Sequence, residues 1–525
     1  MESLIKLADL SYSYVLMNFY NKKTLYSVFI AYGVYKTIYY AFIDPLRKIP
    51  GPWYARFTSF PSMLALMTGE ATTYYQSMHD KYGPIVRTSP NESSVANTKE
   101  FKKVMASYRY RKSEIYEGFA NVGENIFSTR HEDFNRMRRR QVGPAFSATG
   151  LDTVDSLLLE LCVTNVENKF IQDIELGDGA ATFNYFKHYQ NIAADVIGEL
   201  AFGKSFDAVK NDGHDIIEWV NASMRNSIIF KSFPVLKLIQ GLIPALTINE
   251  KKLRNYCLEA IKQRKNLIKI NKYDNKRTDI LQMYLTAINT SNNKPMSEDE
   301  MISEMVTMVI AGVDTTSITM TWLTVYYMLY PHIYKKVLDE IRTNFPDKDR
   351  KITHHDARNK LPYFIATVYE VLRVVGSVGG TLFRSAPKEG VEIYGYSVPE
   401  GNELIMFVPG THNDTDVWDD PTTFNPDRFL GPEGEKLKKE IVAFSTGVRI
   451  CPGRNLAWIE IFLSIPNMLK DFDLELPADS KFGPNILDPK RNNQPLLPKD
   501  ITFGTRPPAN PDADCNIVIK KRVYL

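Results

Sequence analysis

A lone cysteine lies in a glycine-containing turn near the end of the chain, in a setting that suits a metal-bound thiolate. Residues 444–453 read FSTGVRICPG, so that Cys451 lies between Gly447 and Gly453. Glycines let the backbone fold closely around sulfur, and N–H groups can then point at the thiolate. An anionic sulfur ligand gives iron the electron density that favours cleavage of an O–O bond. The alternative interpretation is a buried free cysteine on a turn, the usual state of a lone cysteine.

A second group of reactive side chains lies within a stretch of helical apolar spacing. Residues 311–316 read AGVDTT, which places the carboxyl of Asp314 next to the hydroxyl of Thr315. Such a pair can relay protons one at a time to metal-bound oxygen, and Gly312 leaves room for a ligand beside the helix. Consecutive threonines can also bond back to helix carbonyls and open a local bulge. Taken alone, the segment fits helix–helix packing equally well.

A third group of charged residues is informative only together with the first two. Glu370 and Arg373 are three residues apart, the spacing of an ordinary surface pair worth a few tenths of a kcal/mol. Arg428 follows in a stretch that reads FNPDRF. Glu370 comes 55 residues after Thr315 and 81 residues before Cys451.

In order, spacing and fixed positions, these segments resemble the cytochrome P-450 family. The resemblance implies that Cys451 is the thiolate ligand of haem b, that Thr315 is the catalytic alcohol and that Asp314 is the acid beside it. The resemblance covers nearly the whole chain, and the members of the family that this chain resembles are microsomal and fungal. It also implies roles for further residues: Phe444 and Gly453 enclose the sulfur, Arg139, Arg384 and Arg449 pair with haem propionates, and Glu370, Arg373 and Arg428 form a buried structural triad.

One position departs from the family pattern. The family usually carries tryptophan or histidine four residues before the propionate arginine, where this chain has Asn135. An amide can still donate a hydrogen bond to a propionate, but the ring is lost. Residues 136–140 read RMRRR, and arginines so close on a helix must point in different directions. We expect Arg139 to reach the haem and Arg136 to be solvated.

The elements that must hold these residues are mostly helical. Residues 297–300 read SEDE, a capping-box pattern, and the helix that they open can continue to Tyr330, before Pro331. Such a helix is roughly 50 Å long at 1.5 Å per residue, and its apolar residues on most sides indicate that it is buried. Beyond residue 380 the pattern changes to short strands and turns, as in residues 391–396. The predicted fold class is mainly α with a smaller β portion, and the resemblance implies one large domain with the cytochrome P-450 fold.

The N-terminal region has the composition of a membrane anchor. Residues 25–43 are almost wholly apolar or aromatic and are interrupted by Lys36. They are barely long enough to span a bilayer, which needs roughly 20 residues, and no small-residue cleavage site follows. We therefore predict an uncleaved single-pass anchor, while Lys36 leaves a buried or interfacial helix as the alternative. Pro-Gly-Pro at 50–52 indicates a stiff hinge. The predicted division is an anchor with its hinge approach at 1–48 and a haem-thiolate catalytic domain at 49–525.

Composition excludes several classes of protein. The formal net charge of the 525 residues is +3, which gives no indication of nucleic-acid binding. The four cysteines form no Cys-x-x-Cys pair, which excludes zinc ribbons, the common iron–sulfur spacings and thioredoxin-like redox chemistry. The chain also lacks a Gly-x-Gly-x-x-Gly nucleotide fingerprint, so electrons must come from another protein.

The resemblance implies the partners and the location. They are O2, a lipophilic small-molecule substrate, the lipid bilayer and NADPH-cytochrome P-450 reductase in the endoplasmic reticulum membrane, with the catalytic domain facing the cytosol. We expect five basic residues to meet the acidic face of the reductase, namely Arg138, Arg140, Lys436, Lys438 and Lys439.

The implied reaction is hydroxylation of a steroid, terpenoid, fatty acid or aromatic compound. The family positions of the pocket carry bulky uncharged residues, which favours an apolar substrate. Residues 228–246 fit either a segment that dips into the bilayer or a core helix pair. Two other functions remain open: a haem-thiolate isomerase or dehydratase that needs no reductase, and a non-enzymatic haem gas sensor. The expected pocket residues are Tyr116, Phe119, Met308, Val309, Val378 and Phe503.

Overall fold

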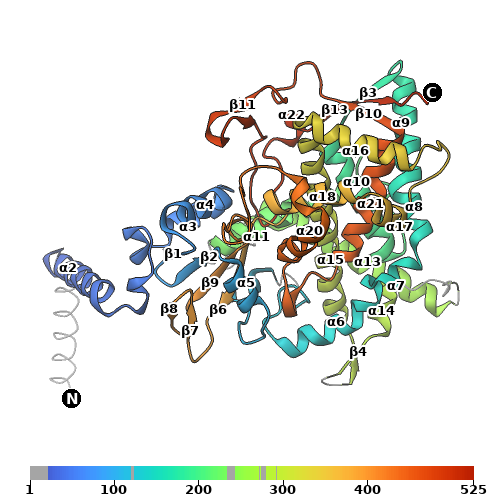
Figure 1. Ribbon diagram of the computed structural model, residues 1–525. Coiled ribbons are helices and arrows are strands. Elements are labelled where there is room, and N and C mark those ends of the chain that lie inside the picture. The colour runs from blue at the N-terminus through green and yellow to red at the C-terminus, as the bar shows by residue number, and fades with distance from the viewer. Residues whose placement is uncertain are drawn as a thin grey trace.

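A computed structural model describes residues 22–119, 123–232, 243–270, 272, 279–290 and 293–524. Most of the described chain forms one helical body with small sheets at its margins, and α2 stands apart from that body (Figure 1). The predicted fold class, mainly α with a smaller β portion, is confirmed.

The helices before the long central helix are α2 (Lys22–Ile38), α3 (Phe60–Met67), α4 (Ala71–Tyr82), α5 (Thr98–Met105), α6 (Glu132–Phe146), α7 (Ala148–Asp152), α8 (Asp155–Leu159), α9 (Asn165–Leu176), α10 (Tyr185–Phe202), α11 (Asp215–Ser232), α13 (Ile248–Lys269) and α14 (Ile280–Thr286). The remaining helices are α15 (Glu298–Leu329), α16 (Pro331–Asn344), α17 (His354–Lys360), α18 (Pro362–Val374), α19 (Val408–Thr411), α20 (Gly431–Leu437), α21 (Arg454–Asp471) and α22 (Pro511–Asp514).

The strands form small separate sheets. The four-stranded sheet has the order β1-β2-β9-β6 and the three-stranded sheet has the order β10-β13-β3. The predicted turn region 391–396 is the β7–β8 hairpin, with Tyr394 and Gly395 at positive φ between its strands. The bounds are β1 (Ile85–Ser89), β2 (Glu92–Val95), β3 (Ala180–Asn184), β4 (Ile288–Asn289), β5 (Lys294–Pro295), β6 (Thr381–Ser385), β7 (Val391–Ile393), β8 (Tyr396–Val398), β9 (Glu403–Phe407), β10 (Phe472–Glu475), β11 (Leu487–Asp488), β12 (Gln494–Pro495) and β13 (Asn516–Lys521).

The long helix α15 begins and ends where the sequence predicts. The backbone N–H of Glu300 donates to Ser297 Oγ at 3.3 Å, and the N–H of Ser297 donates to Glu300 Oε2 at 2.8 Å, which completes the capping box. Pro331 then opens α16. By length and composition α15 is the one helix of the described residues that is apolar enough to cross a membrane, but it lies buried in the protein core.

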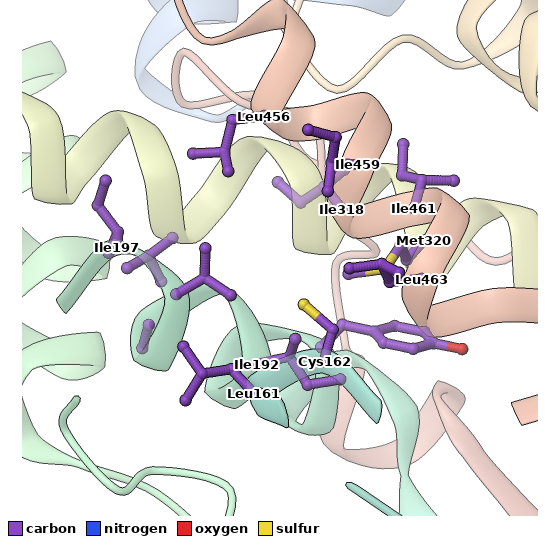
Figure 2. Packing of buried hydrophobic residues seen from close by; sticks show 14 of the residues in the cluster. Leu161, Cys162, Ile192, Ile197, Ile318, Met320, Leu456, Ile459, Ile461 and Leu463 are labelled. Atoms are coloured by element: carbon purple, nitrogen blue, oxygen red, sulfur yellow. The ribbon is translucent and has the colours of Figure 1, made fainter. Parts of the chain in front are cut away.

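The core is built where α10, α15 and α21 meet. The hydroxyls of Tyr189 on α10 and Thr324 on α15 lie 2.8 Å apart, which joins the two helices by a buried hydrogen bond. A Cβ atom at Gly312 would lie 2.8 Å from Ile197 Cγ1, so glycine permits the close approach of α10 and α15. Figure 2 shows part of this packing, with Leu161 and Cys162 from the π-helical turn Glu160–Thr164, Ile192 and Ile197 from α10, Ile318 and Met320 from α15, and Leu456, Ile459, Ile461 and Leu463 from α21.

The connection from α2 to the body is fixed by charge and by packing. Asp44 forms a buried ion pair with Arg87 on β1, and Leu46 is buried in the cluster that covers this sheet. The predicted stiff segment 50–52 lies against the same strand, because a Cβ atom at Gly51 would lie 2.5 Å from the Arg87 carbonyl oxygen. Residues from Asp44 onward therefore pack with the helical body.

The structure brings Glu370, Arg373 and Arg428 together. Both carboxylate oxygens of Glu370 accept hydrogen bonds from Arg373 at 2.8 Å, and Glu370 Oε1 also accepts from Arg428 Nε at 3.2 Å. Arg373 donates further to the carbonyl oxygens of His412 and Pro421, and Glu370 and Arg373 are fully buried. This charge cluster joins α18 to the segment that leads toward Cys451.

We expect Glu370→Gln to destabilise the protein by about 3–5 kcal/mol, because a fully buried guanidinium then loses its counter-charge. The midpoint of chemical denaturation measures the change. The control is Glu389→Gln, which disrupts an exposed pair with Arg109 and should cost no more than about 1 kcal/mol. Equal losses in the two variants would contradict the structural role of Glu370.

Candidate active site

A cavity of about 400 Å³ lies inside the helical body. The thiol of Cys451 lines it from the loop before α21, and the hydroxyl of Thr315 lines it from α15. Most of its wall is apolar, with polar groups at a few points. A concave apolar site with a few convergent polar groups is the usual form of a cofactor or substrate site.

The loop that carries Cys451 is held in an unusual backbone conformation. Ser445 and Gly447 both have positive φ, and the N–H of Cys451 donates to the Phe444 carbonyl oxygen at 2.9 Å. A Cβ atom at Gly447 would lie 2.3 Å from the Met105 carbonyl oxygen. This position therefore requires glycine, and the sequence supplies it where the turn presses against α5.

The Cys451 side chain is exposed and lines the cavity. Burial raises the pKa of the Cys451 thiol, while the N–H of Gly453, the guanidinium of Arg139 and the charge and N–H of Arg454 lower it. Backbone N–H groups and nearby cations stabilise a thiolate, and a bound metal deprotonates a coordinating thiol outright. The loop is therefore suited to hold sulfur as an anionic metal ligand.

Four cationic side chains converge at one end of the cavity: Lys112, Arg139, Arg384 and Arg449. Burial lowers the pKa of Lys112 well below its usual value, and the charges of Arg384, Arg449 and Arg139 lower it further. Among the described residues, Glu132 is the one carboxylate within ion-pair distance of any of the four, at 3.0 Å from Arg449. Arg449 Nη1 is buried without a hydrogen-bond partner in the described part of the chain.

This charge distribution fits the two propionates of a haem. Burying several cations beside one carboxylate is costly unless a further anion joins them. A flat, largely apolar ring that carries two carboxylates would satisfy both the wall of the cavity and these cations. The three predicted arginines line this cavity, and so do Phe444 and Gly453.

The sequence alone assigned no role to Lys112, and the structure shows which partners Asn135 contacts. The ammonium of Lys112 lies 4.0 Å from the centre of the Tyr116 ring, and it donates to the Phe127 carbonyl oxygen. Asn135 is buried, donates to the Ile126 carbonyl oxygen at 2.9 Å and accepts from Arg139 Nε at 3.2 Å. The amide therefore orients Arg139.

The side chains of the predicted acid–alcohol pair, Asp314 and Thr315, point in different directions. Thr315 lines the cavity and bonds back to the Ala311 carbonyl oxygen at 2.9 Å. Asp314 is buried and accepts hydrogen bonds from Thr505 at 2.7 Å and Gln190 at 3.2 Å. Burial raises the pKa of Asp314, and these two hydrogen bonds oppose the rise. Thr505 also lines the cavity, so its hydroxyl links the carboxyl to that space.

One expectation about the basic surface is wrong. Arg138 was expected to be available to a partner, but its side chain is fully buried and pairs with Glu300 at 2.6 Å and Glu304 at 3.2 Å. The Arg138 side chain reaches α15, which supplies both carboxylates. Arg140, Lys436 and Lys439 are exposed, and Arg136 is exposed as expected, whereas Lys438 is half-buried and pairs with Glu435.

Most of the expected pocket residues line the cavity. Tyr116, Phe119, Met308 and Val378 do so, which agrees with an apolar ligand. Val309 instead packs into the helical core, and Phe503 is not among the described residues that line the cavity. Of the apolar segment 228–246, residues 233–242 lie outside the described residues.

A further acidic residue lines the cavity and was not predicted. Glu460 lies on α21, is buried, and its Oε2 has no hydrogen-bond partner among the described residues. Burial raises the pKa of Glu460 well above the usual value for a glutamic acid. The signal in the sequence is weak, because a glutamate on a helix is normally solvated.

The comparisons with known proteins agree with this geometry. The family model described as "Cytochrome P450" matches residues 50–497. The cytochrome P450 monooxygenases helB1 and helB3 of Aspergillus fumigatus are 31% and 29% identical, each over 95% of this chain and over 86% and 98% of their own lengths. A crystal structure of the cytochrome P450DA heme domain matches 91% of this chain and 98% of its own, with a TM-score of 0.74 and 17% identity.

We expect Glu460→Gln to change how stability depends on pH. The folded-state pKa of Glu460 lies above its unfolded value, so wild-type stability falls as pH rises from the unfolded pKa through the folded pKa. The amide cannot ionise, so the denaturation midpoint of the variant should rise relative to that of the wild type as the pH increases above the ordinary pKa of a glutamic acid. The exposed Glu433→Gln serves as the control and should show no such trend. Parallel pH profiles for Glu460→Gln and wild type would contradict the expectation.

Proposed function

This chain belongs to the cytochrome P450 family, as the match over residues 50–497 shows, and its relatives are monooxygenases. From that premise we propose that it hydroxylates a lipophilic small molecule, using O2 and two electrons from an NADPH-cytochrome P450 reductase. The observation that carries the proposal is a thiol and a hydroxyl, Cys451 and Thr315, that line one apolar cavity edged by buried cations.

The cofactor that these residues fit is haem b. Cys451 would hold the iron, and Arg139, Arg384, Arg449 and Lys112 would pair with the propionates. Bound there, haem would supply the redox-active centre that activates O2. Phe444 and Gly453 line the cavity together with Cys451, where they would limit access of water to the sulfur.

The chain itself supplies the proton path. The Thr315 hydroxyl lies at the cavity wall, and the carboxyl of Asp314 would reach the cavity through the hydroxyl of Thr505, which donates to it. Because burial raises the pKa of Asp314, this acid can carry a proton nearer neutral pH than an exposed aspartic acid. A buried relay of this kind delivers protons without filling the cavity with water.

The walls of the cavity favour an apolar substrate. Tyr116, Phe119, Met308 and Val378 present aromatic or aliphatic surface, which suits a steroid, terpenoid, fatty acid or aromatic compound. Specificity among these classes depends on shape, because the described wall offers a substrate few polar partners.

The location that we propose is the endoplasmic reticulum membrane, with the catalytic body in the cytosol. Support comes from α2, whose apolar side chains are largely exposed: Phe29 is 65% and Ile30 67% accessible. A surface of this kind requires an apolar environment. Lys36 lies over the rings of Tyr32 and Tyr40, where aromatic residues can hold it near the membrane interface.

The proposed surface for the reductase is the basic group that remains exposed, Arg140, Lys436 and Lys439. Product formation that depends on NADPH, reductase and O2 together would support monooxygenase chemistry. Product formation without reductase would instead favour the isomerase or dehydratase function, and haem binding without any turnover would favour a gas sensor.

We expect the reduced, carbon-monoxide-bound protein to have a strongly red-shifted Soret band that Cys451→Ala lacks, since a neutral ligand cannot donate as a thiolate does. The absorbance difference spectrum is the measurement. Cys257→Ala removes a fully buried cysteine elsewhere in the core and should keep the band. A band that survives in haem-loaded Cys451→Ala would exclude this sulfur as the ligand.

We expect Arg384→Gln to release haem at least about tenfold faster than wild type, because a buried propionate partner is lost. Transfer of haem to excess apomyoglobin reports the rate. The matched control is Arg136→Gln, on an exposed face of the same helix as Arg139. If both variants release haem at the wild-type rate, Arg384 does not hold the cofactor.

A further inference from the structure

Two histidines and two aspartates lie together where α7, α8 and α17 meet. Asp152 ends α7, Asp155 begins α8, and His354 and His355 open α17. We refer to these four residues as the His–Asp cluster. None of them lines the cavity, so the cluster is separate from the proposed active site.

The distances within the cluster match those between ligands of a tetrahedral metal ion. His354 Nε2 lies 3.1 Å from Asp155 Oδ1 and 3.6 Å from Asp152 Oδ1, and His355 Nε2 lies 3.5 Å from Asp152 Oδ1. Zinc bonds of roughly 2.0–2.2 Å at tetrahedral angles separate neighbouring ligand atoms by about 3.4 Å. The ligand atoms of Asp152, His354 and His355 all lie within 4.8 Å of one another, so one ion could reach these three, with Asp155 beside His354.

The protein alone leaves polar atoms of this cluster unsatisfied. The His354 side chain is only 3% exposed, and neither of its ring nitrogens has a hydrogen-bond partner among the described residues. Asp155 Oδ1, which faces it, is likewise buried without a hydrogen bond in the described chain. Unsatisfied buried polar groups are costly, and each such group in a folded protein calls for an explanation such as a bound ion.

A pair of protonated histidines would not resolve this cost. The two imidazole rings lie with their centroids 3.9 Å apart, so that two positive charges would repel each other. Burial and the neighbouring His355 both lower the pKa of His354, opposed by the two aspartates. A divalent cation instead accepts the lone pairs of both neutral rings and balances both carboxylates.

We propose that the His–Asp cluster binds one divalent transition-metal ion, with zinc the preferred ion. Two imidazole nitrogens with carboxylate oxygens suit zinc, whereas magnesium and calcium prefer ligand sets made of oxygen alone. The ion would join α17 to the α7–α8 turn. Because α17 and α8 both contact α21, which begins directly after the Cys451 loop, the ion would brace the helix that supports that loop.

Titration calorimetry of the full-length haem-loaded protein with zinc chloride tests the proposal, using protein without a polyhistidine tag. We expect one zinc per chain, and an affinity weakened at least about tenfold in His355→Ala and in Asp152→Asn. Both of these side chains are about half exposed, so the variants should fold. His332→Ala removes an exposed histidine from α16 and should bind zinc as the wild type does.

Zinc should also raise the thermal unfolding midpoint of the wild type and of His332→Ala, but not that of the two cluster variants. The proposal is overturned if the wild type binds no zinc, or if the cluster variants bind it with wild-type affinity. Binding of magnesium as tight as that of zinc would equally overturn the assignment of nitrogen ligands.

Discussion

The constraint on which the rest of the structure depends is buried positive charge at one end of an apolar cavity. Lys112, Arg139, Arg384 and Arg449 come from separate parts of the chain, and of the carboxylates in the described residues only Glu132 lies within ion-pair distance of them. The Glu370 cluster shows the contrast, because there buried guanidinium groups are neutralised by the protein itself. A site with excess cations depends on an anionic ligand, so folding and haem binding should stabilise each other.

Features encoded by neighbouring residues could be predicted from the sequence. The bounds of α15 follow from the capping box at Ser297 and from Pro331, and the β7–β8 hairpin follows from local turn signals. Features that depend on distant partners could not. The burial of Arg138 depends on Glu304, which lies far along the chain on another helix. The His–Asp cluster likewise requires α17 to pack beside α7 and α8, which spacing alone does not reveal.

The glycine of the AGVDTT segment has more than the predicted role. It was expected to make room for a ligand, and Gly312 does line the cavity. A side chain there would also meet Ile197 on α10, so the same residue determines how closely two core helices pack. This close packing restricts the motion of α15 next to the cavity. The wall that presents Thr315 is held against α10, and the hydroxyl therefore has little freedom to move relative to the cavity.

The direction of Asp314 also bears on how water is excluded. Its carboxyl turns toward Thr505 and Gln190, and the hydroxyls of Thr315 and Thr505 are among the polar groups that line the cavity in this region. Arg506 follows Thr505 in the chain, and its carbonyl oxygen accepts a hydrogen bond from Trp322 Nε1 at 2.8 Å. This hydrogen bond fixes the backbone next to Thr505. An acid placed behind a hydroxyl can resupply protons while remaining out of contact with substrate. An exposed carboxylate at the wall would attract water, and water would compete with an apolar substrate for the same space.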